Sequence, residues 1–377
     1  MPQPAERRFR QILSALLRFV LGPSRPGPFE AGVSPRIFVI RQHNQLGDML
    51  CVVPLLRALR TRYPGSHIAL LASPVNFDVM VGNRHINEVI KFDKNEFLRG
   101  KGGSLLRFPG FIRRLRKNRF DIAVVPSTVS TSFTSDLIAF LCGAAVRIGA
   151  GSIQGDANPS AFFFTHPRVL DWRGRKDYHQ VRRNMDIWPE EFPGDIDLAT
   201  EITLTEVELA GGKSLLLNLS RGSARVIIYH PGAGKVPNRW PAGLFARLAD
   251  ELHGTVQAST VITAGPMDDG PVGAMVSALH TPYQLIKNQP IRQVASAIRY
   301  ADLVVSNDTG IMHVAAAVGT PVLSLFGPTD PGEWAPTGKR HRYIRGEDGD
   351  TGKIRYDDVL RNALEMLRGS TNDDHRI

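Results

Sequence analysis

From Arg36 onward, the chain alternates short apolar runs with longer segments whose apolar residues recur at helical spacing. The apolar runs are RIFVIR, HIALLA, FDIAVV, RVIIYH, STVITA, DLVVSND and PVLSLF. Most of them lack a regular alternation of polar and apolar residues, which is typical of strands covered on both faces. The segments between them, such as DMLCVVPLLRALRTR and AGLFARLADELH, have helical periodicity. This order of strands and helices predicts parallel α/β sheets.

The alternation breaks between about Asp171 and Arg225 and restarts with RVIIYHPG. Because 377 residues also exceed one ordinary domain, we predict two successive α/β domains with a ligand cleft between them. The predicted divisions are 1–34 for a basic helix and a Pro/Gly linker, 35–205 for the first domain, 206–224 for a linker, 225–345 for the second domain, and 346–377 for a last helix and a polar tail.

The first segment, RRFRQILSALLRFVLG at residues 7–22, predicts a short basic amphipathic helix. Such a helix could bind an anionic lipid surface, or it could pack on the protein itself. No apolar stretch reaches the roughly 20 residues that a membrane span needs, and the ordered parts of a signal peptide are missing. The two cysteines, Cys51 and Cys142, are too few for a disulfide framework. We therefore expect a cytosolic protein.

The net charge of +10 is concentrated in the first half of the chain. Residues 1–205 contain 28 Lys and Arg against 18 Asp and Glu, whereas residues 206–377 contain 18 of each. Within 99–119 there are eight basic residues and no acid: Arg99, Lys101, Arg107, Arg113, Arg114, Arg116, Lys117 and Arg119. A charge run is usually a solvated face, but this asymmetry also fits an anionic acceptor or a membrane surface.

The segment RQHNQLGDML follows the first predicted strand and precedes a helix. Gly47 permits a tight turn, and Asp48 is then expected at the carboxyl edge of the sheet, where ligands of such folds bind. A carboxylate there can accept a proton from a hydroxyl nucleophile. The alternative is an ordinary helix N-cap. The glycines of a dinucleotide-binding fingerprint are absent.

The stretch DLVVSNDTGIMHVAAAVGTPVLSLFGPTDP carries a polar turn between a buried strand and a helix of small residues. The free N–H groups and the dipole at the start of that helix suit a diphosphate. Asp308 would repel phosphate, so we expect it to hold sugar hydroxyls. A second polar turn, FGPTDP, follows the next strand, which favours a binding site over an ordinary capped helix.

The segment YHPGAGKVPNRWP offers glycines for close approach to phosphate, with Lys235 and Arg239 as cations. It is not a nucleotide-triphosphate P-loop, because the first required glycine is missing and Val236 follows the lysine. After another strand, TAGPMDDG places Asp268 and Asp269 where a carboxylate could bind a ribose diol, or where they could simply begin a solvated helix.

Taken in order, these segments resemble glycosyltransferase family nine, the ADP-heptose:lipopolysaccharide heptosyltransferases. The resemblance runs from about Arg36 to Gly338 and involves IRQHNQLGDMLCVVPLLRALRTRYPGSHI, HPGAGKVPNRWPAGLFARLADEL, AGPMDD and SNDTGIMHVAAAVGTPVLSLFGPTDPGEW. It implies a GT-B fold, in which two Rossmann-like domains with parallel sheets face a central cleft. It also implies an inverting, metal-independent transfer without a cofactor.

The resemblance further implies roles for individual residues. Asp48 would be the general base, Thr309, Gly310 and His313 would surround the donor diphosphate, Asp308 would contact the sugar, and Asp268 would lie near the nucleoside. The full predicted donor site is Gly234, Lys235, Asn238, Arg239, Asp268, Asp308, Thr309, Gly310, Met312 and His313, and the predicted acceptor site is Arg113, Arg114, Arg116 and Lys117.

Two departures from the family pattern bear on the substrate. Asn238 occupies the place of a lysine in the usual K-R-W-P or K-H-W-P pattern, and HNQ before Leu46 is bulkier than the usual small residues. The expected activity is transfer of heptose or a related sugar from a nucleotide diphosphate sugar, ADP-heptose by resemblance, to a lipopolysaccharide-core or other lipid-anchored glycan.

The expected partners and location follow from that activity. They are a nucleotide-sugar donor, an anionic lipid-linked acceptor and peripheral contact with the inner face of the cytoplasmic membrane. The alternative is a catalytically degenerate GT-B protein that binds anionic glycan or lipid. Nucleic-acid binding is disfavoured, since no helix-turn-helix or aromatic-interleaved pattern accompanies the charge.

Overall fold

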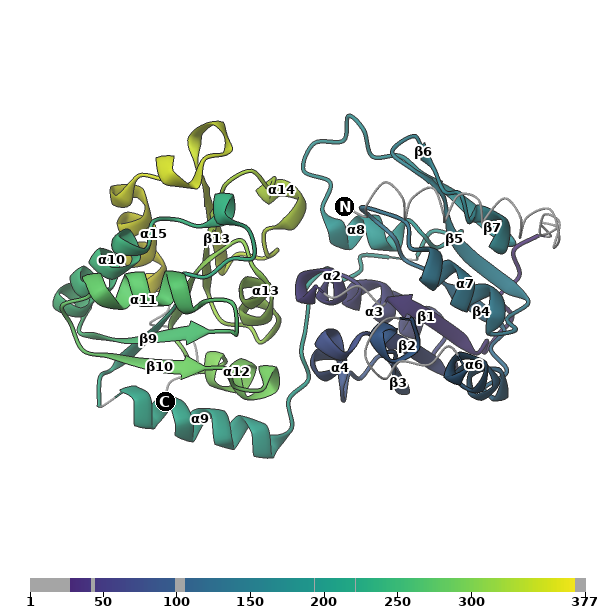
Figure 1. Ribbon diagram of the computed structural model, residues 1–377, viewed down its shortest axis with the longest axis horizontal. Helices are drawn as coiled ribbons and strands as arrows, with labels where there is room; N and C mark the ends of the chain where they lie inside the picture. Colours follow the sequence, from purple (N-terminus) through teal and green to yellow (C-terminus); the bar gives the residue numbers. More distant parts are fainter. Residues whose placement is uncertain (1–27, 42–44, 99–105, 193, 221, 370–377) are drawn as a thin grey trace. The chain divides into compact units, whose positions relative to one another are not determined.

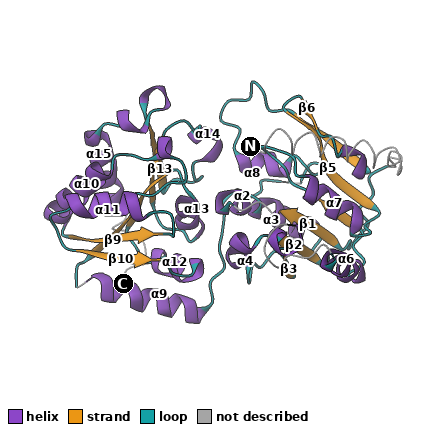
Figure 2. Ribbon diagram, in the orientation of Figure 1, coloured by secondary structure: helices purple, strands orange, loops and turns teal. Residues whose placement is uncertain are grey.

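The computed structural model describes residues 28–41, 45–98, 106–192, 194–220 and 222–369. The predicted helix at 7–22 and the tail at 370–377 lie outside these ranges. The chain forms two compact units, which we call unit 1 (Met1–Phe77 and Asn83–Leu198) and unit 2 (Asp78–Gly82 and Ala199–Ile377). Figure 1 shows the chain coloured along its sequence, and Figure 2 shows the same view by secondary structure.

Unit 1 is built on a seven-stranded sheet in the order β3-β2-β1-β4-β5-β6, with β7 also paired to β5. The strands are β1 (Ile37–Arg41), β2 (Ile68–Ala72), β3 (Glu88–Lys91), β4 (Ile122–Val124), β5 (Val146–Ile153), β6 (Asp156–Ala157) and β7 (His166–Leu170). All pairings are parallel except that of β5 with β6. The strands β1, β2 and β4 are buried along their whole length, as unalternating apolar runs require.

The helices of unit 1 cover this sheet and connect its strands. They are α2 (Leu46–Leu50), α3 (Val53–Arg62), α4 (Pro74–Met80), α5 (Lys94–Leu98), α6 (Arg107–Lys117), α7 (Phe133–Leu141) and α8 (Gln180–Met185). On one face, α6 and α7 bury apolar side chains against β1 and β4, forming a cluster that includes Phe38, Phe111 and Ile138. Parallel strands joined by helices make this a Rossmann-like unit.

Unit 2 contains a six-stranded, entirely parallel sheet in the order β10-β9-β8-β11-β12-β13. Its strands are β8 (Arg225–His230), β9 (Ala258–Ala264), β10 (Tyr283–Lys287), β11 (Leu303–Asn307), β12 (Val322–Phe326) and β13 (His341–Arg345). Its helices are α9 (Glu206–Ser220), α10 (Ala242–Val256), α11 (Asp269–Ala278), α12 (Ile291–Ile298), α13 (Gly310–Ala317), α14 (Pro331–Trp334) and α15 (Tyr356–Gly369).

Each of the seven apolar runs in the sequence is a strand, and both sheets have a topological switch point. In unit 1 the chain leaves β1 in one direction to β2 and later returns to its other side with β4, and β8, β9 and β11 repeat this order in unit 2. Loops at the carboxyl ends of such strands splay apart and leave a crevice. The structure therefore confirms parallel α/β sheets and provides a ligand-binding edge in each unit.

One stretch differs from the sequence expectation, and the predicted last helix is present. The segment 206–224, predicted as a linker, contains the helix α9, which packs on α12. The last helix, α15, packs into the core of unit 2, where Val359, Ala363 and Leu367 are fully buried. No helix among the described residues is both long and apolar enough to span a bilayer.

The contact between α9 and α12 depends on one of two adjacent glycines. A Cβ at Gly212 would lie 2.3 Å from the carbonyl carbon and oxygen of Ser296, whereas a Cβ at Gly211 meets nothing within 4 Å. Because Ser296 contributes backbone atoms of a neighbouring helix, the clash at Gly212 cannot be relieved by rotating a side chain. Gly212 thus sets the separation of the two helices.

We predict opposite effects of alanine at these two positions. Gly212→Ala should lower the free energy of unfolding by about 1–3 kcal/mol, because the helices must move apart. Gly211→Ala should raise it by up to about 1 kcal/mol, since alanine favours the helix and meets empty space. Urea unfolding followed by circular dichroism measures both, and equal effects of the two substitutions would contradict the assigned contact.

Candidate functional site

Asp48 lies at the switch point of unit 1, in the first turn of α2. Strand β1 ends at Arg41, and Gln45 is the N-cap of α2, with extended backbone angles of φ −124 and ψ 125. Asp48 is therefore not the N-cap that the alternative interpretation expected. Its carboxylate is 8% exposed and stands near the positive end of the short helix, which favours a negative charge.

Arg41 is the cation that accompanies Asp48. Its Nη2 donates to Asp48 Oδ1 at 2.5 Å, and its Nη1 donates to the carbonyl oxygen of Pro126 at 2.6 Å. Pro126 follows β4, so the arginine joins the ends of the two strands that flank the switch point. Sequence reasoning missed Arg41, although an arginine that closes a fully buried strand was a visible signal. It is 2% exposed, and a charge so buried requires a partner.

Burial and Arg41 act in opposite directions on Asp48. Burial raises the pKa of Asp48 above its ordinary value, and the charge of Arg41 lowers it. Burial, followed by the nearby charge of Asp48, raises the pKa of the Cys51 thiol to about 12, so that thiol stays protonated. Among the described residues, Arg41 is the hydrogen-bond donor to this carboxylate, and it uses Oδ1. No described residue donates a hydrogen bond to Oδ2, the oxygen that could accept a proton from a ligand hydroxyl.

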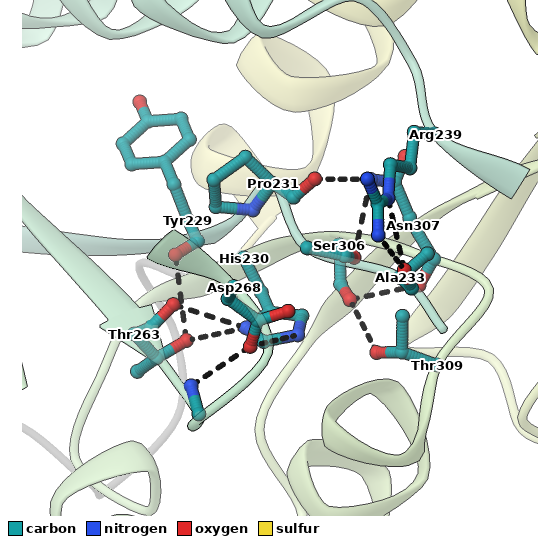
Figure 3. A network of polar contacts seen from close by, with 12 residues as sticks. Tyr229, His230, Pro231, Ala233, Arg239, Thr263, Asp268, Ser306, Asn307 and Thr309 are labelled. Atoms are coloured by element: carbon teal, nitrogen blue, oxygen red, sulfur yellow. Dashed lines mark hydrogen bonds and ion pairs between the residues drawn. The ribbon is translucent and has the colours of Figure 1, made fainter. Parts of the chain in front are cut away.

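In unit 2, the end of strand β11 organises the loop that follows β8. Asn307 Nδ2 donates to the carbonyl oxygen of Pro231 at 2.9 Å, and its Oδ1 accepts from the backbone N–H of Trp240 at 2.9 Å. Figure 3 shows Asn307 among the side chains and carbonyls of this loop. Both ends of the loop are thus fixed to β11, and the predicted donor residues on the two segments come together.

The helix α13, whose start is the predicted diphosphate site, begins at Gly310. Thr309 is the N-cap, with extended angles of φ −148 and ψ 171, and its hydroxyl lies 3.3 Å from that of Ser306. Met312, which the predicted donor site includes, has no exposed surface. His313 is 5% exposed, and its ring lies edge-on to Trp334.

Asn238, which occupies the place of the usual lysine, contacts Asp308. Asn238 Nδ2 donates to Asp308 Oδ2 at 2.9 Å and lies 3.5 Å from Thr329 Oγ1. Burial raises the pKa of Asp308, while the Thr329 hydroxyl, the charge of Lys235 and the Asn238 amide oppose that rise. A neutral amide thus holds this carboxylate in place.

The other predicted residues of this loop have different surroundings. Gly234 and Lys235 are exposed, and a Cβ at Gly234 would meet nothing within 4 Å. Arg239, by contrast, donates through Nε and Nη2 to the carbonyl oxygen of Ala233, at 2.9 and 2.7 Å. Its guanidinium is engaged in closing the loop (Figure 3), so Lys235 is the more available of the two cations.

Asp268 is tied to the protein more than the sequence suggested. Its Oδ2 accepts from the backbone N–H of Gly265 at 2.8 Å and lies 3.9 Å from Nε2 of His230. Burial lowers the pKa of His230, which favours the neutral ring. A Cβ at Gly232 would lie 2.1 Å from Asp268 Oδ1, so Gly232 is required by this aspartate. Asp268 therefore contacts the loop after β9 at Gly265 and the loop after β8 at Gly232.

The predicted acceptor residues lie on α6 but do not lie beside Asp48. All four are exposed, while Arg116 Nε donates to the carbonyl oxygen of Leu141. Directly after α6, the Asn118 carbonyl accepts from Arg36 Nε at 2.6 Å, and Arg36 precedes β1. The end of α6 is therefore at the amino edge of the sheet, opposite Asp48. Arg116 and Lys117, in the last turn of α6, therefore lie at that edge and not at the edge of Asp48.

A family model places the chain among known proteins. The model of glycosyltransferase family 9 (heptosyltransferase) matches residues 110–363, which is more than half of the chain. The protein belongs to glycosyltransferase family 9. It is therefore a glycosyltransferase, and the matched range includes the segments around Lys235, Asp268 and Asp308.

Individual relatives agree with this assignment. The chain is similar to lipopolysaccharide heptosyltransferase 2 of Escherichia coli K12, with 29% identity over 80% of this chain and 85% of the relative. Among solved structures, a family 9 glycosyltransferase from Veillonella parvula matches with a TM-score of 0.77 and 23% identity, covering 89% of this chain and 98% of that one. E. coli ADP-heptose lps heptosyltransferase II matches with a TM-score of 0.72 and 23% identity, covering 89% and 99%. The fold of this glycosyltransferase is GT-B.

Removal of Arg41 tests the buried pair. We expect Arg41→Met to lower the free energy of unfolding by about 3–5 kcal/mol at pH 7, because it leaves a buried carboxylate without its cation. The pKa of Asp48 then rises further, so the folded state binds a proton more readily than the unfolded state, and the deficit should shrink as the pH is lowered toward 5.

Urea unfolding of wild type, Arg41→Met and Arg41→Met/Asp48→Asn at both pH values measures this effect. The double variant should recover part of the loss at pH 7, because it contains no unpaired buried charge. A deficit of Arg41→Met that is the same at both pH values would contradict a charge-dependent pair.

Proposed function

We propose that this glycosyltransferase moves heptose from ADP-heptose to a lipopolysaccharide-core acceptor, with inversion at the anomeric carbon. The observation that carries the proposal is the Asp48 carboxylate, which Arg41 holds through Oδ1 at a switch point, while no residue of the described ranges donates to Oδ2. The names of the relatives support heptose as the sugar, ADP as the nucleotide and lipopolysaccharide as the acceptor class.

The reaction is a single displacement. The acceptor hydroxyl oxygen forms a bond to the anomeric carbon while the bond from that carbon to the diphosphate oxygen breaks. The hydroxyl proton goes to Asp48 Oδ2, and ADP leaves with the bonding electron pair. A single attack from the face opposite the leaving group inverts the configuration. Arg41 stabilises the ionised form of Asp48, which is the form that accepts the proton.

The carboxyl edge of unit 2 supports donor binding. The N–H groups at the start of α13 and the Lys235 ammonium can stabilise the charge that develops on the leaving diphosphate. Asn238 donates one hydrogen bond to Asp308 Oδ2. A carboxylate can accept several hydrogen bonds, so Asp308 can also accept from sugar hydroxyls. Asn238 therefore replaces a cation without dismantling the site, which argues against a protein that has lost its activity.

An anionic lipid-linked acceptor would bring the enzyme to the inner face of the cytoplasmic membrane. The exposed cations of α6, on the surface of unit 1, support contact with anionic headgroups. Because part of α6 lies at the edge opposite Asp48, we assign this helix to the membrane surface and not to the reacting sugar.

Replacement of the proposed base tests the function. Asp48→Asn should lower kcat by about 10²–10⁴-fold with ADP-heptose and a deacylated core acceptor, because the amide cannot accept the proton. The dissociation constant of ADP-heptose should remain unchanged. Asp136→Asn is the matched control, since Asp136 is a buried carboxylate of unit 1 held by Ser160 and Asn158. A wild-type rate in Asp48→Asn would refute the assignment.

Asn238 should control how donor affinity depends on pH. In Asn238→Leu the pKa of Asp308 rises further, so the carboxylate protonates and stops accepting sugar hydroxyls at a higher pH than in wild type. Calorimetric titration of ADP-heptose from pH 5 to 8 should show affinity that falls earlier on acidification, with a loss of roughly tenfold at the acidic end. Asn238→Lys should retain binding across this range. Identical pH profiles for wild type and Asn238→Leu would exclude this role.

A further inference from the structure

A pocket of about 530 Å³ lies in unit 1, between the end of β7 and the segment after α8. We call it the β7–α8 pocket and define it by Arg168, Trp172, Arg175, Tyr178, Arg182 and Trp188. Its volume is in the range of small-molecule sites, and it combines aromatic rings with guanidinium groups, as sites for polar ligands do. None of these residues belongs to the predicted acceptor set.

A single carboxylate holds two of the rings of this pocket. Asp186 follows α8 as its C-cap, and its Oδ2 accepts from Trp172 Nε1 at 2.7 Å. Its Oδ1 lies 3.1 Å from the hydroxyl of Tyr178, which donates to it. Both rings are therefore fixed before any ligand arrives, which reduces the entropy that binding would cost.

Two N–H donors of the pocket are buried without an acceptor among the residues that the structure describes. Trp188 is 2% exposed, and its Nε1 has no hydrogen-bond partner; Nε of Arg168 is buried and unpartnered as well. Leaving a donor buried and unsatisfied costs about 1–3 kcal/mol, so such groups are rare in native proteins. Neither nitrogen has accessible surface, so a ligand oxygen satisfies such a donor once its side chain turns toward the pocket.

The cations of the pocket are available, whereas several of its acids are engaged. Arg175 lies over the ring of Tyr178 at 4.9 Å, and no carboxylate pairs with Arg168, Arg175 or Arg182 among the described residues. The lining also contains five acids. Asp171 pairs with Arg173 and Glu190 with Arg62, Asp186 holds the two rings, and Glu191 and Asp195 are exposed. Guanidinium groups bind carboxylate and phosphate oxygens through two parallel hydrogen bonds.

The pocket lies at the same edge of the sheet as Asp48. Helix α8 packs on α3, and Asn184 Nδ2 lies 3.3 Å from the carbonyl oxygen of Cys51, the C-cap of α2. Strand β7 is three places from β1 in the sheet, which corresponds to about 14 Å. A ligand that reached from the pocket to Asp48 would therefore be an oligosaccharide and not a single sugar.

From this geometry we propose that the β7–α8 pocket binds the acidic saccharide of the acceptor, at a distance from the sugar that is glycosylated. Arg175 and Arg182 hold its carboxylate or phosphate groups, and Trp188 Nε1 donates to a sugar oxygen. The inference rests on the proposed function for the identity of the acceptor. It also replaces α6 as the acceptor-binding element.

Calorimetric titration of the full chain with deacylated, lipid-free lipopolysaccharide core oligosaccharide tests the pocket. The double variant Arg175→Ala/Arg182→Ala should weaken binding roughly tenfold or more, because two charged hydrogen-bonding groups are lost. Trp188→Phe, which keeps an aromatic ring and removes the N–H, should weaken it several-fold. Methyl esterification and dephosphorylation of the oligosaccharide should abolish the difference between wild type and the arginine variant.

Two other variants remove the same charge elsewhere. Arg355→Ala/Arg361→Ala, on and next to α15 in unit 2, should bind the oligosaccharide as wild type does. Arg113→Ala/Arg114→Ala removes two charges from α6 and represents the competing assignment. If the α6 variant loses affinity and the pocket variants do not, or if wild type does not bind the oligosaccharide, the proposal is wrong. Melting temperatures of all variants verify that they are folded.

Transfer assays on the same samples separate this proposal from the proposed function. If the oligosaccharide binds through Arg175 and Arg182 but receives no heptose from ADP-heptose, the proposed function fails and the pocket stands. If it is glycosylated with an acceptor KM that is unchanged in the arginine variant, the function stands and the pocket fails.

Discussion

A charged group buried at the end of a parallel strand must be stabilised locally, and the functional edges of both units depend on this constraint. Strand β1 ends in Arg41, which is stable there only because Asp48 and the Pro126 carbonyl accept its hydrogen bonds. The same contacts fix the ends of β1 and β4 at the switch point. A requirement of folding thus orients the carboxylate that is proposed to perform the chemistry, so position and charge of the base come from one interaction.

In unit 2, the largely buried carboxylate after strand β11 is held by a neutral amide and not by an arginine. Asp308 is held by the amide of Asn238, and Asn307 fixes the loop that carries Asn238. A lysine in that place would add a positive charge beside the donor. The amide adds no charge, so burial raises the pKa of Asp308 with Lys235 as the cation that opposes this rise. In the proposed donor site, Lys235 is then the cation left for the diphosphate. The departure from the family pattern therefore changes the electrostatics of the donor site while it preserves the geometry.

Much of the fold could be predicted from apolar runs, because strands buried on both faces leave a clear signal. Helix α9 was missed because its paired glycines resemble a linker, although Gly212 serves a contact with a distant helix. The charge of α6 revealed an exposed surface but not the edge at which it lies, which depends on the connection to β1. The motifs pointed to the loops after β8 and β11, which the structure joins through Asn238 and Asp308. The burial of Met312 and the engagement of Arg239 depend on tertiary packing that spacing does not encode.

Asp48, whose ionised form is stabilised by the charge of Arg41, is proposed to be the general base of the transfer. Carbon NMR of the full-length enzyme with ¹³C-labelled aspartate carboxyls, assigned with Asp48→Asn, can measure the pKa of this group directly. This pKa should lie above that of an ordinary aspartate, because burial raises it. It should also coincide with the acidic limb of the pH profile of kcat/KM for transfer. If Asp48 titrates at a pH clearly different from that limb, it is not the base.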